Sequence, residues 1–181
     1  MNIYIALLRG INVSGQKKIK MAHLKSLMVA DGCIDVQTYI QSGNIVFKSS
    51  ETELDTLSKQ LEQLIQTNYE FHVPVLILTP TQLLKAKQNN PFLMDESKDT
   101  SKLSFSFLYT TPTSENITKL MSYTFPEEEI ILLNDMVYLY LINGAGRAKL
   151  TNNFMENKLK VTASSRNFNT VLKLIEMSKS E

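Results

Sequence analysis

The chain has 181 residues, of which 43% are hydrophobic and 20% are charged, and its formal net charge is +1. This composition is typical of a globular protein and excludes a generally disordered chain. The nearly neutral charge also excludes a strongly basic nucleic-acid-binding domain, so any basic site must be local.

Cysteine content and hydropathy limit where the protein acts. The single cysteine, Cys33, cannot form an internal disulfide or supply a zinc-binding pair, and we expect an inert, partly buried thiol. No stretch approaches the roughly 20 apolar residues that a membrane span needs, and the start MNIYIALLRG lacks the basic lead of a signal peptide. We therefore expect a cytoplasmic protein with no membrane association.

The first half of the chain predicts the element order βαββαβ. Residues 2–8 are apolar on both strand faces, which favours a strand covered on both sides. Ser42-Gly43 separates two β-rich runs and predicts a hairpin with a tight turn. The predicted elements are a strand at 2–8, a helix that ends at Asp31-Gly32, strands at 35–41 and 44–48, a helix with its apolar stripe at 54–65 after a Ser50–Glu53 capping box, and a strand at 73–78.

The second half begins with a helix from Thr79, whose capping box is closed by Gln82, and continues through a polar loop at 90–101. Asn134-Asp135 separates two further β-rich runs. The predicted elements after the loop are a strand at 103–109, a short helix near 117–121, strands at 128–133 and 136–142, a helix at 151–158, a strand at 159–163 and a helix at 167–178.

This order predicts an α+β fold with two ferredoxin-like halves, each of the βαββαβ type with an antiparallel sheet, and extra helices. The predicted domains are residues 1–79 and residues 80–181, and the second is a ferredoxin-like variant with terminal helices. The duplication is inferred from the order of elements, because the sequence shows no convincing residue-level repeat.

The loop from Arg9 to Lys20 is the first candidate binding segment. It leaves a predicted strand and enters a predicted helix, where backbone N–H groups and the helix dipole favour an anion. Arg9 and three lysines add positive charge. Gly10 and Gly15 have the spacing of a Walker loop, but Gln16 replaces the lysine that this motif requires. The alternative is a solvated connection whose lysines maintain solubility.

Residues 39–44 and two segments near the end of the chain are further candidates. Segments 144–152 and 164–170 place glycine, serine or asparagine with a basic residue just before a helix, so both are potential anion sites. The alternatives are structural. Gly43 and Asn44 fit a turn, and Thr151 and Ser165 or Asn167 fit helix caps.

Other signatures are weaker. His23 and His72 offer no metal pair, no nucleophile–histidine–acid set can be assembled, and we expect neither a metal nor a cofactor. Residues 127–129, three glutamates, are interpreted as a solvated strand entry. Residues 3–8 look like the first-strand motif of an RNA-recognition fold. Residues 43–48, however, do not match its third-strand motif and lack the exposed aromatic residues that stack bases, so nucleic acid is not an expected partner.

Three segments, LLRGINVSGQKKIKM, YIQSGNIVF and AKLTNNFMENKLKVTASSRNFNTVLKL, resemble the bacterial family catalogued as domain of unknown function 1697. Typical strings of that family are LLRGINVGG…K(V/I)PM, YIQSGNVVF and SKLTN…(T/S)RNWNTV. The resemblance implies an α+β fold with ferredoxin-like character and no assigned activity. Ser14, Lys20 and Phe168 depart from the family strings.

The leading hypothesis is a protein that binds a small anionic ligand, such as a nucleotide or another phosphorylated metabolite, in a cleft between the two halves. Arg9 and Arg166 would bind the anion, and amide side chains would orient the ligand. The predicted ligand-binding residues are Arg9, Asn12, Lys18, Lys20, Gln41, Ser42, Asn44, Lys149, Thr151, Arg166, Asn167 and Asn169. The alternatives are an enzyme acting on a phosphorylated metabolite and a protein-interaction module without a ligand.

Overall fold

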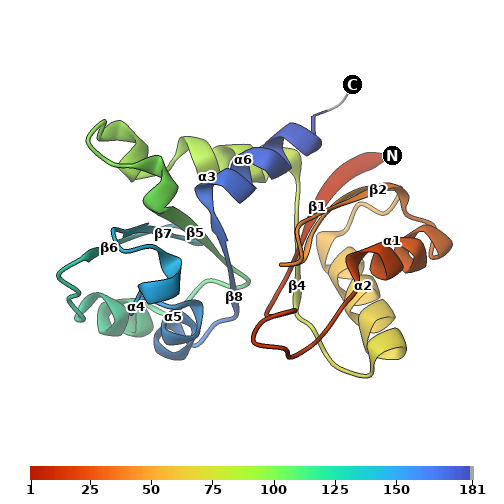
Figure 1. Cartoon of the computed structure of the whole chain (residues 1–181), viewed down its shortest axis with the longest axis horizontal. Helices are drawn as coiled ribbons and strands as arrows, with labels where there is room; N and C mark the ends of the chain where they lie inside the picture. Colours follow the sequence, from red (N-terminus) through yellow and green to blue (C-terminus); the bar gives the residue numbers. More distant parts are fainter. Residues whose placement is uncertain (180–181) are drawn as a thin grey trace. The chain divides into compact units, whose positions relative to one another are not determined.

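The computed structural model describes residues 1–179, which form two four-stranded antiparallel sheets and six α-helices (Figure 1). The sheets belong to two compact units. Unit 1 comprises residues 1–84 and the chain from Lys173, and unit 2 comprises residues 85–172. The predicted α+β class with two similar halves is confirmed. The predicted domain division after residue 79 stays a prediction, because compactness does not measure independent folding.

Unit 1 contains the first βαββαβ sequence, and its sheet has the strand order β2-β3-β1-β4. Its elements are β1 (Asn2–Leu8), α1 (Met21–Ala30), β2 (Ile34–Tyr39), β3 (Asn44–Ser49), α2 (Leu54–Tyr69) and β4 (Val75–Leu78). Helices α1 and α2 cover one face of this sheet (Figure 1). Leu24 of α1 and Ile65 of α2 are completely buried there, in one cluster with Ala6 and Ile45 of the central strands. The predicted apolar stripe of α2 therefore packs on the sheet.

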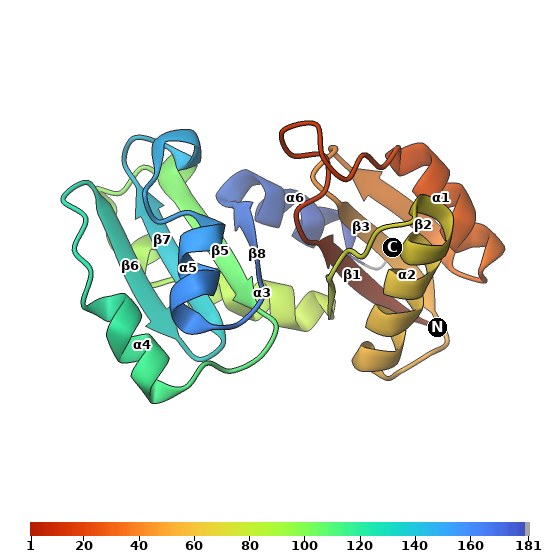
Figure 2. The same cartoon turned by 90° about the horizontal axis from the view of Figure 1, so that it is seen from below.

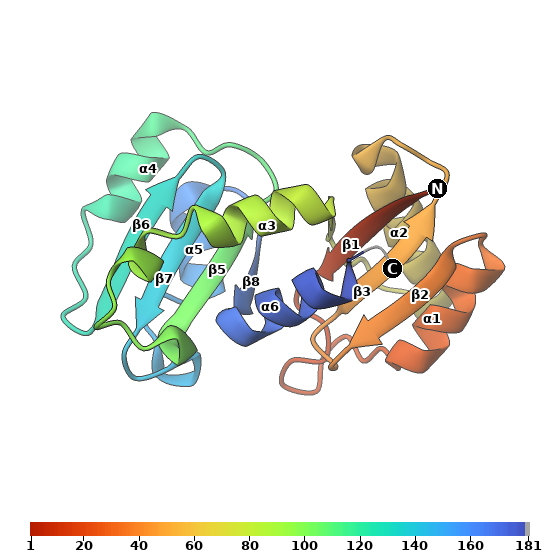
Figure 3. The same ribbon diagram turned by 90° about the horizontal axis from the view of Figure 1, so that it is seen from above.

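Unit 2 repeats this order in β5 (Leu103–Leu108), α4 (Ser114–Met121), β6 (Glu128–Leu133), β7 (Met136–Leu141), α5 (Asn152–Leu159) and β8 (Ala163–Asn167). Its strand order is β6-β7-β5-β8, which can be followed in Figure 3. Helices α4 and α5 lie on one face of the sheet (Figure 2). The remaining helices are α3 (Pro80–Gln88) and α6 (Phe168–Met177), and residues 90–101 contain a short 3-10 turn at Pro91–Met94.

The predicted strand at 159–163 is wrong by several residues. Leu159 is completely buried as the last residue of α5, and Lys160 ends that helix in a left-handed conformation with φ +57°. The strand begins only at Ala163, whose amide donates to Glu156 Oε1 at 2.8 Å. Leu159 therefore belongs to the end of the helix, and the strand starts four residues later.

Two local predictions about helix and hairpin ends have opposite outcomes. The Thr79–Gln82 capping box is confirmed, because Thr79 Oγ1 accepts from the Gln82 amide and Gln82 Oε1 accepts from the Thr79 amide. The Ser50–Glu53 box is wrong, since the carboxylate of Glu51 instead accepts from the amides of Thr52 and Glu53 at 2.7 and 2.9 Å.

The connection between β2 and β3 is a four-residue loop, residues 40–43, rather than the predicted tight turn. Gly43 holds it against the end of β1, where its carbonyl accepts the Leu8 amide at 2.9 Å. Gly43 has φ +80°, and a Cβ there would lie 2.6 Å from Leu8 Cβ and 3.0 Å from Ile11 Cδ1. This position therefore requires both the conformational freedom and the small size of glycine.

We expect Gly43→Ala to destabilise the protein by about 3 kcal/mol, because the left-handed backbone and the contact with Leu8 both oppose a methyl group. Gly15→Ala is the matched control: Gly15 has φ +76° but no atom within 4 Å of a built Cβ, so only the backbone cost of about 1 kcal/mol applies. Urea unfolding of both variants measures the difference. Equal losses would contradict the steric role of Gly43.

Candidate functional site

Two of the four predicted binding segments meet in unit 1, and the side chain of Asn12 joins them. Asn12 Nδ2 donates to the Gln41 carbonyl at 2.7 Å and to the Ile19 carbonyl at 3.0 Å. Asn12 Oδ1 accepts from the Ile19 amide at 2.9 Å. We call residues 9–20 together with residues 40–43 the loop platform. Its two segments form one surface because Asn12 connects both ends of the first loop to the second.

The first loop of the platform is also fixed at other points. The Arg9 amide donates to the Pro74 carbonyl at 2.9 Å, and Lys17 Nζ donates to the His72 carbonyl at 2.7 Å. A bridge between Val13 and Gln16 makes its tip a small hairpin. Ser14, which replaces a glycine of the family strings, takes φ +49° in this tip.

The loop platform lies in a strongly basic stretch of the sequence. Residues 1–30 contain five lysine or arginine residues and no aspartate or glutamate, although the whole chain has a net charge of only +1. Lys18 and Lys20 are exposed, and Lys20 is the N-cap residue of α1. Positive charge is therefore concentrated where α1 begins.

The N-terminus of α1 differs from the other helix starts within residues 1–179. No side chain caps it, and its first turn has no acidic residue. At four other helices, a side-chain oxygen accepts from a backbone amide of the first turn. These caps are Thr79 for α3, Thr113 for α4, Thr151 for α5 and Asn167 for α6. Helix α2 also has no side-chain cap, but it has Asp55 in its first turn. Among these six helices, α1 alone has neither a side-chain cap nor an acidic residue in its first turn.

Other predicted residues of unit 1 hold the hairpin loop. Asn44 is completely buried, and its Nδ2 donates to the Tyr39 carbonyl at 3.1 Å and to Ser42 Oγ at 2.9 Å. These bonds support the structural alternative for Asn44, because they close the loop from inside. The side chain of Gln41 is exposed on the platform.

Several predicted residues of unit 2 also make local structural bonds. Thr151 Oγ1 accepts from the Phe154 amide at 3.1 Å, and Asn167 Oδ1 accepts from the Thr170 amide at 2.8 Å, so both are helix caps. Arg166 is only 8% exposed, and its Nη1 donates to the Ser165 carbonyl at 2.8 Å. Lys149 and Asn169 are exposed. That all these residues share one site with the loop platform stays a prediction.

The anion position predicted before α5 holds an internal carboxylate. The amides of Lys149 and Leu150 donate to the two carboxylate oxygens of Glu128 at 2.6 and 2.7 Å. Residues 127–129 do enter β6, and Glu127 and Glu129 are exposed, as the sequence predicts. Glu128 differs, because it is half-buried and its carboxylate is bonded to the chain before α5. The amides of Lys149 and Leu150 are therefore already hydrogen-bonded to a side chain of the protein.

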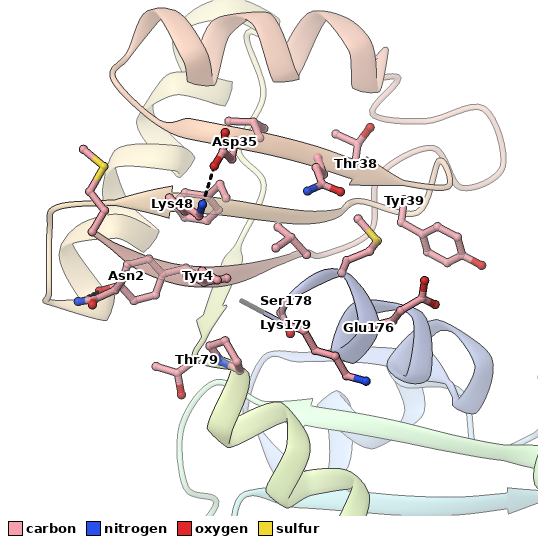
Figure 4. Close-up of a pocket in the computed structure, with 18 of the residues that line it drawn as sticks. Asn2, Tyr4, Asp35, Thr38, Tyr39, Lys48, Thr79, Glu176, Ser178 and Lys179 are labelled. Atoms are coloured by element: carbon pink, nitrogen blue, oxygen red, sulfur yellow. Dashed lines mark hydrogen bonds and ion pairs between the residues drawn. The ribbon is translucent and has the colours of Figure 1, made fainter. Parts of the chain in front are cut away.

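Unit 1 also has an open groove of about 1660 Å³, which none of the twelve predicted residues lines (Figure 4). Strand residues such as Asn2 and Tyr39 lie on one side, and Glu176, Ser178 and Lys179 lie on the other. Lys48 pairs with Asp35 at 2.6 Å on the strand side. Sequence reasoning missed this groove because its residues come from three strands, several helix starts and residues 173–179, without any continuous motif.

Among residues 1–179, no cluster of three or more histidine, cysteine, aspartate or glutamate side chains is placed to hold a metal ion. Over the same range, no helix combines the length and the apolar character needed to cross a membrane.

Comparison with known proteins agrees with the sequence strings. The family model described as "Protein of unknown function (DUF1697)" matches residues 1–138. The chain belongs to the DUF1697 family. A solved structure titled "The structure of conserved bacterial protein SP0830 from Streptococcus pneumoniae" is similar, with a TM-score of 0.71 and 24% identity over 98% of each chain. At this identity the likeness shows the fold alone. No curated protein matches the sequence.

The loop platform carries two of the DUF1697 strings, RGIN and QSGN, and the structure gives them a shared physical explanation. Asn12 joins the loops, Gly43 permits their close approach, and Asn44 closes the hairpin. These roles account for three motif residues without a ligand. They do not account for Lys18, an exposed basic residue that matches the lysine of the family string K(V/I)PM.

We expect Asn12→Ala to destabilise unit 1 by about 2–3 kcal/mol, because three hydrogen bonds are lost and the Ile19 and Gln41 groups lose their partner. Asn12→Asp should destabilise the protein less, since its carboxylate still accepts from the Ile19 amide although it cannot donate. Chemical unfolding and backbone amide exchange at residues 12–19 measure the stability of both variants. A loss below about 0.5 kcal/mol in Asn12→Ala would show that Asn12 does not hold the platform.

The thiol of Cys33 is partly buried, as expected, and its low reactivity stays a prediction. Burial raises the pKa of this thiol, and the nearby Asp31 carboxylate raises the pKa further. We therefore expect Cys33 to react with a disulfide reagent several-fold more slowly at pH 8 than the same thiol in the unfolded chain, since a raised pKa leaves less thiolate. Asp31→Asn should increase the rate, and a rate equal to that of the unfolded chain would contradict the pKa shift.

Proposed function

We propose that the loop platform of unit 1 binds a small anionic ligand that carries a phosphate group. The observation that carries this proposal is the start of α1: it lacks an internal cap and lies in a 30-residue stretch with five basic residues and no acidic one. Helix N-termini favour anions through their amides and their dipole, and neighbouring lysines add to this attraction.

Comparison with unit 2 supports the proposal. There, two amides just before α5 bind the Glu128 carboxylate, which shows that this protein supplies an internal anion at such a position. Before α1 the Ile19 amide donates instead to a neutral oxygen, Asn12 Oδ1, and the first turn of α1 has no acidic residue. An external phosphate would supply at α1 the negative charge that Glu128 supplies before α5.

Each platform residue has a separate role in this proposal. Lys18 and Lys20 are exposed and supply charge beside the α1 start, together with Arg9 at the entrance of the loop. Gln41 lies on the neighbouring loop, where its amide would fix the ligand's orientation. Asn12 and Gly43 hold the two loops and need not touch the ligand. The predictions of an enzyme acting on a phosphorylated metabolite and of an interaction module without a ligand stay predictions.

The substitution Lys20→Ser tests the proposal because it has two opposite consequences. A serine at the N-cap should stabilise the protein without ligand by about 1 kcal/mol, since its hydroxyl caps α1. The same change removes one charge and occupies the amides, so stabilisation by inorganic phosphate or ATP should fall. In the unsubstituted protein, a true ligand at about 100 times its dissociation constant adds about 2.7 kcal/mol. Thermal unfolding with and without each compound measures both effects.

The matched control is Lys25→Ser, which removes the same charge from the exposed face of α1, away from its start. We expect it to retain the stabilisation by ligand. If neither phosphate, ATP nor a panel of phosphate esters stabilises the unsubstituted protein, the proposed function is wrong. Equal losses in both variants would show that only net charge, and not the helix start, attracts the anion.

A further inference from the structure

The two helices on one face of the unit 2 sheet bring three aromatic rings together. Tyr123 and Phe154 are perpendicular, with an interplanar angle of 90° and ring centroids 5.3 Å apart. Phe125 stands at 84° to Phe154, with centroids 5.5 Å apart. Tyr123 follows the end of α4, and Phe154 lies in α5 beside it (Figure 2). We call these three residues the aromatic corner.

The aromatic corner is held from inside and accessible from outside. Phe125 and Phe154 are partly buried, because they pack against the core cluster that includes Leu120 and Met155. Tyr123 is 39% exposed. The positions of the inner rings are therefore fixed by the core of unit 2, while a molecule in solution can reach the corner from the side of Tyr123.

A cation of the protein itself already lies against these rings. Lys158 Nζ is 4.4 Å from the Tyr123 centroid and 5.3 Å from the Phe154 centroid, within the roughly 6 Å at which a ring face attracts a cation. Phe154 and Lys158 are four residues apart in α5, so they project from the same side of that helix. Lys158 Nζ also donates to Tyr123 Oη at 2.6 Å, and this bond lowers the pKa of the Tyr123 phenol. The corner is therefore a place where positive charge is favoured.

A second lysine of unit 2 shows how such a cation can be held more firmly. Lys98 Nζ lies 4.3 Å from the Tyr140 centroid and 5.7 Å from the Phe92 centroid, and it is also paired with the Glu129 carboxylate. Within residues 1–179, no carboxylate pairs with Lys158, whose hydrogen bond goes to a neutral phenol oxygen. Lys158 is therefore the more easily displaced of the two.

A quaternary ammonium group suits the aromatic corner better than the lysine does. A lysine ammonium is strongly hydrated and has three N–H donors, of which the Tyr123 oxygen accepts one. A quaternary ammonium has no N–H donor, so it gives up no hydrogen bond when ring faces replace water around it. Lys158 is only half-buried, and its flexible side chain can turn away into solvent.

We propose that the aromatic corner binds a small organic cation with a trimethylammonium head, in the place of the Lys158 ammonium. The head lies against the ring faces of Tyr123 and Phe154, and Lys158 is its internal competitor. This site belongs to unit 2 and takes a cation, so it does not depend on the anion binding proposed for unit 1.

Titration with tetramethylammonium and with choline, followed by the proton NMR shift of their methyl groups, tests the proposal. We expect an upfield shift from the ring faces and a dissociation constant of about 10 mM or lower. The neutral analogue of choline, in which a tert-butyl group replaces the trimethylammonium head, should bind at least about tenfold more weakly, because it has the same shape without the charge. Equal binding of choline and this analogue, or no binding of either cation, would overturn the proposal.

Substitutions at Lys158 and Tyr123 should change choline binding in opposite directions. Lys158→Ala removes the competitor and should lower the dissociation constant at least about threefold, whereas Tyr123→Leu removes a ring face and should raise it at least about tenfold. Tyr123→Phe keeps the ring in its packing and should retain binding, which separates lost binding from lost folding. Retained binding in Tyr123→Leu, or lost binding in Tyr123→Phe, would contradict the proposed site.

Lys119→Ala is the matched control for Lys158→Ala. Lys119 is exposed on α4, and its charge also acts on Tyr123. Both variants remove one positive charge near the aromatic corner, but only Lys158→Ala empties the ring faces. We expect Lys119→Ala to change the dissociation constant of choline less than about twofold. Equal strengthening in the two variants would overturn the proposal, because net charge and not the aromatic corner would then control the binding.

Discussion

The backbone of Gly43 lies so close to Leu8 and Ile11 that no Cβ fits between them. This contact sets the hairpin loop of residues 40–43 directly on the end of β1, where the first loop of the chain begins. Only in that position does the Gln41 carbonyl come within reach of Asn12. The location of the loop platform, and of the α1 start within it, follows from one close packing contact in the core.

The two units share one topology but differ in how they satisfy their helix ends. In unit 2, side chains of the protein accept hydrogen bonds from the backbone amides at helix starts. The Glu128 carboxylate does so before α5, and hydroxyl groups cap α4 and α5. It also buries a closed polar network, in which Ser165 bonds both Ser106 and Asn152. Before α1, unit 1 has a neutral acceptor, Asn12 Oδ1, no side-chain cap and no acidic residue in the first turn, and lysines cluster there. This difference between similar halves is why we propose unit 1 for ligand binding.

The sequence singled out the motif residues but could not separate their roles. Asn12, Asn44 and exposed lysines all look like ligand-binding residues in a polar loop, because each is polar and lies near a glycine. Asn12 bonds a carbonyl 29 residues away, and such a partner is not visible in local sequence. The same limit applies to Glu128, whose amide partners lie 21 and 22 residues later. Residues of the groove were missed entirely, since no single segment contains them.

The sequence by itself determined the α+β class, the order of elements, the apolar stripe of α2 and the Thr79 cap, because periodicity and capping act between residues a few positions apart. It misplaced β8, since apolar residues near 160 fit the end of a helix as well as a strand. Only the tertiary structure decided the strand order, the edge position of β2 and the partners of Asn12 and Glu128. These depend on contacts between distant segments, and such contacts exist only once both sheets are assembled.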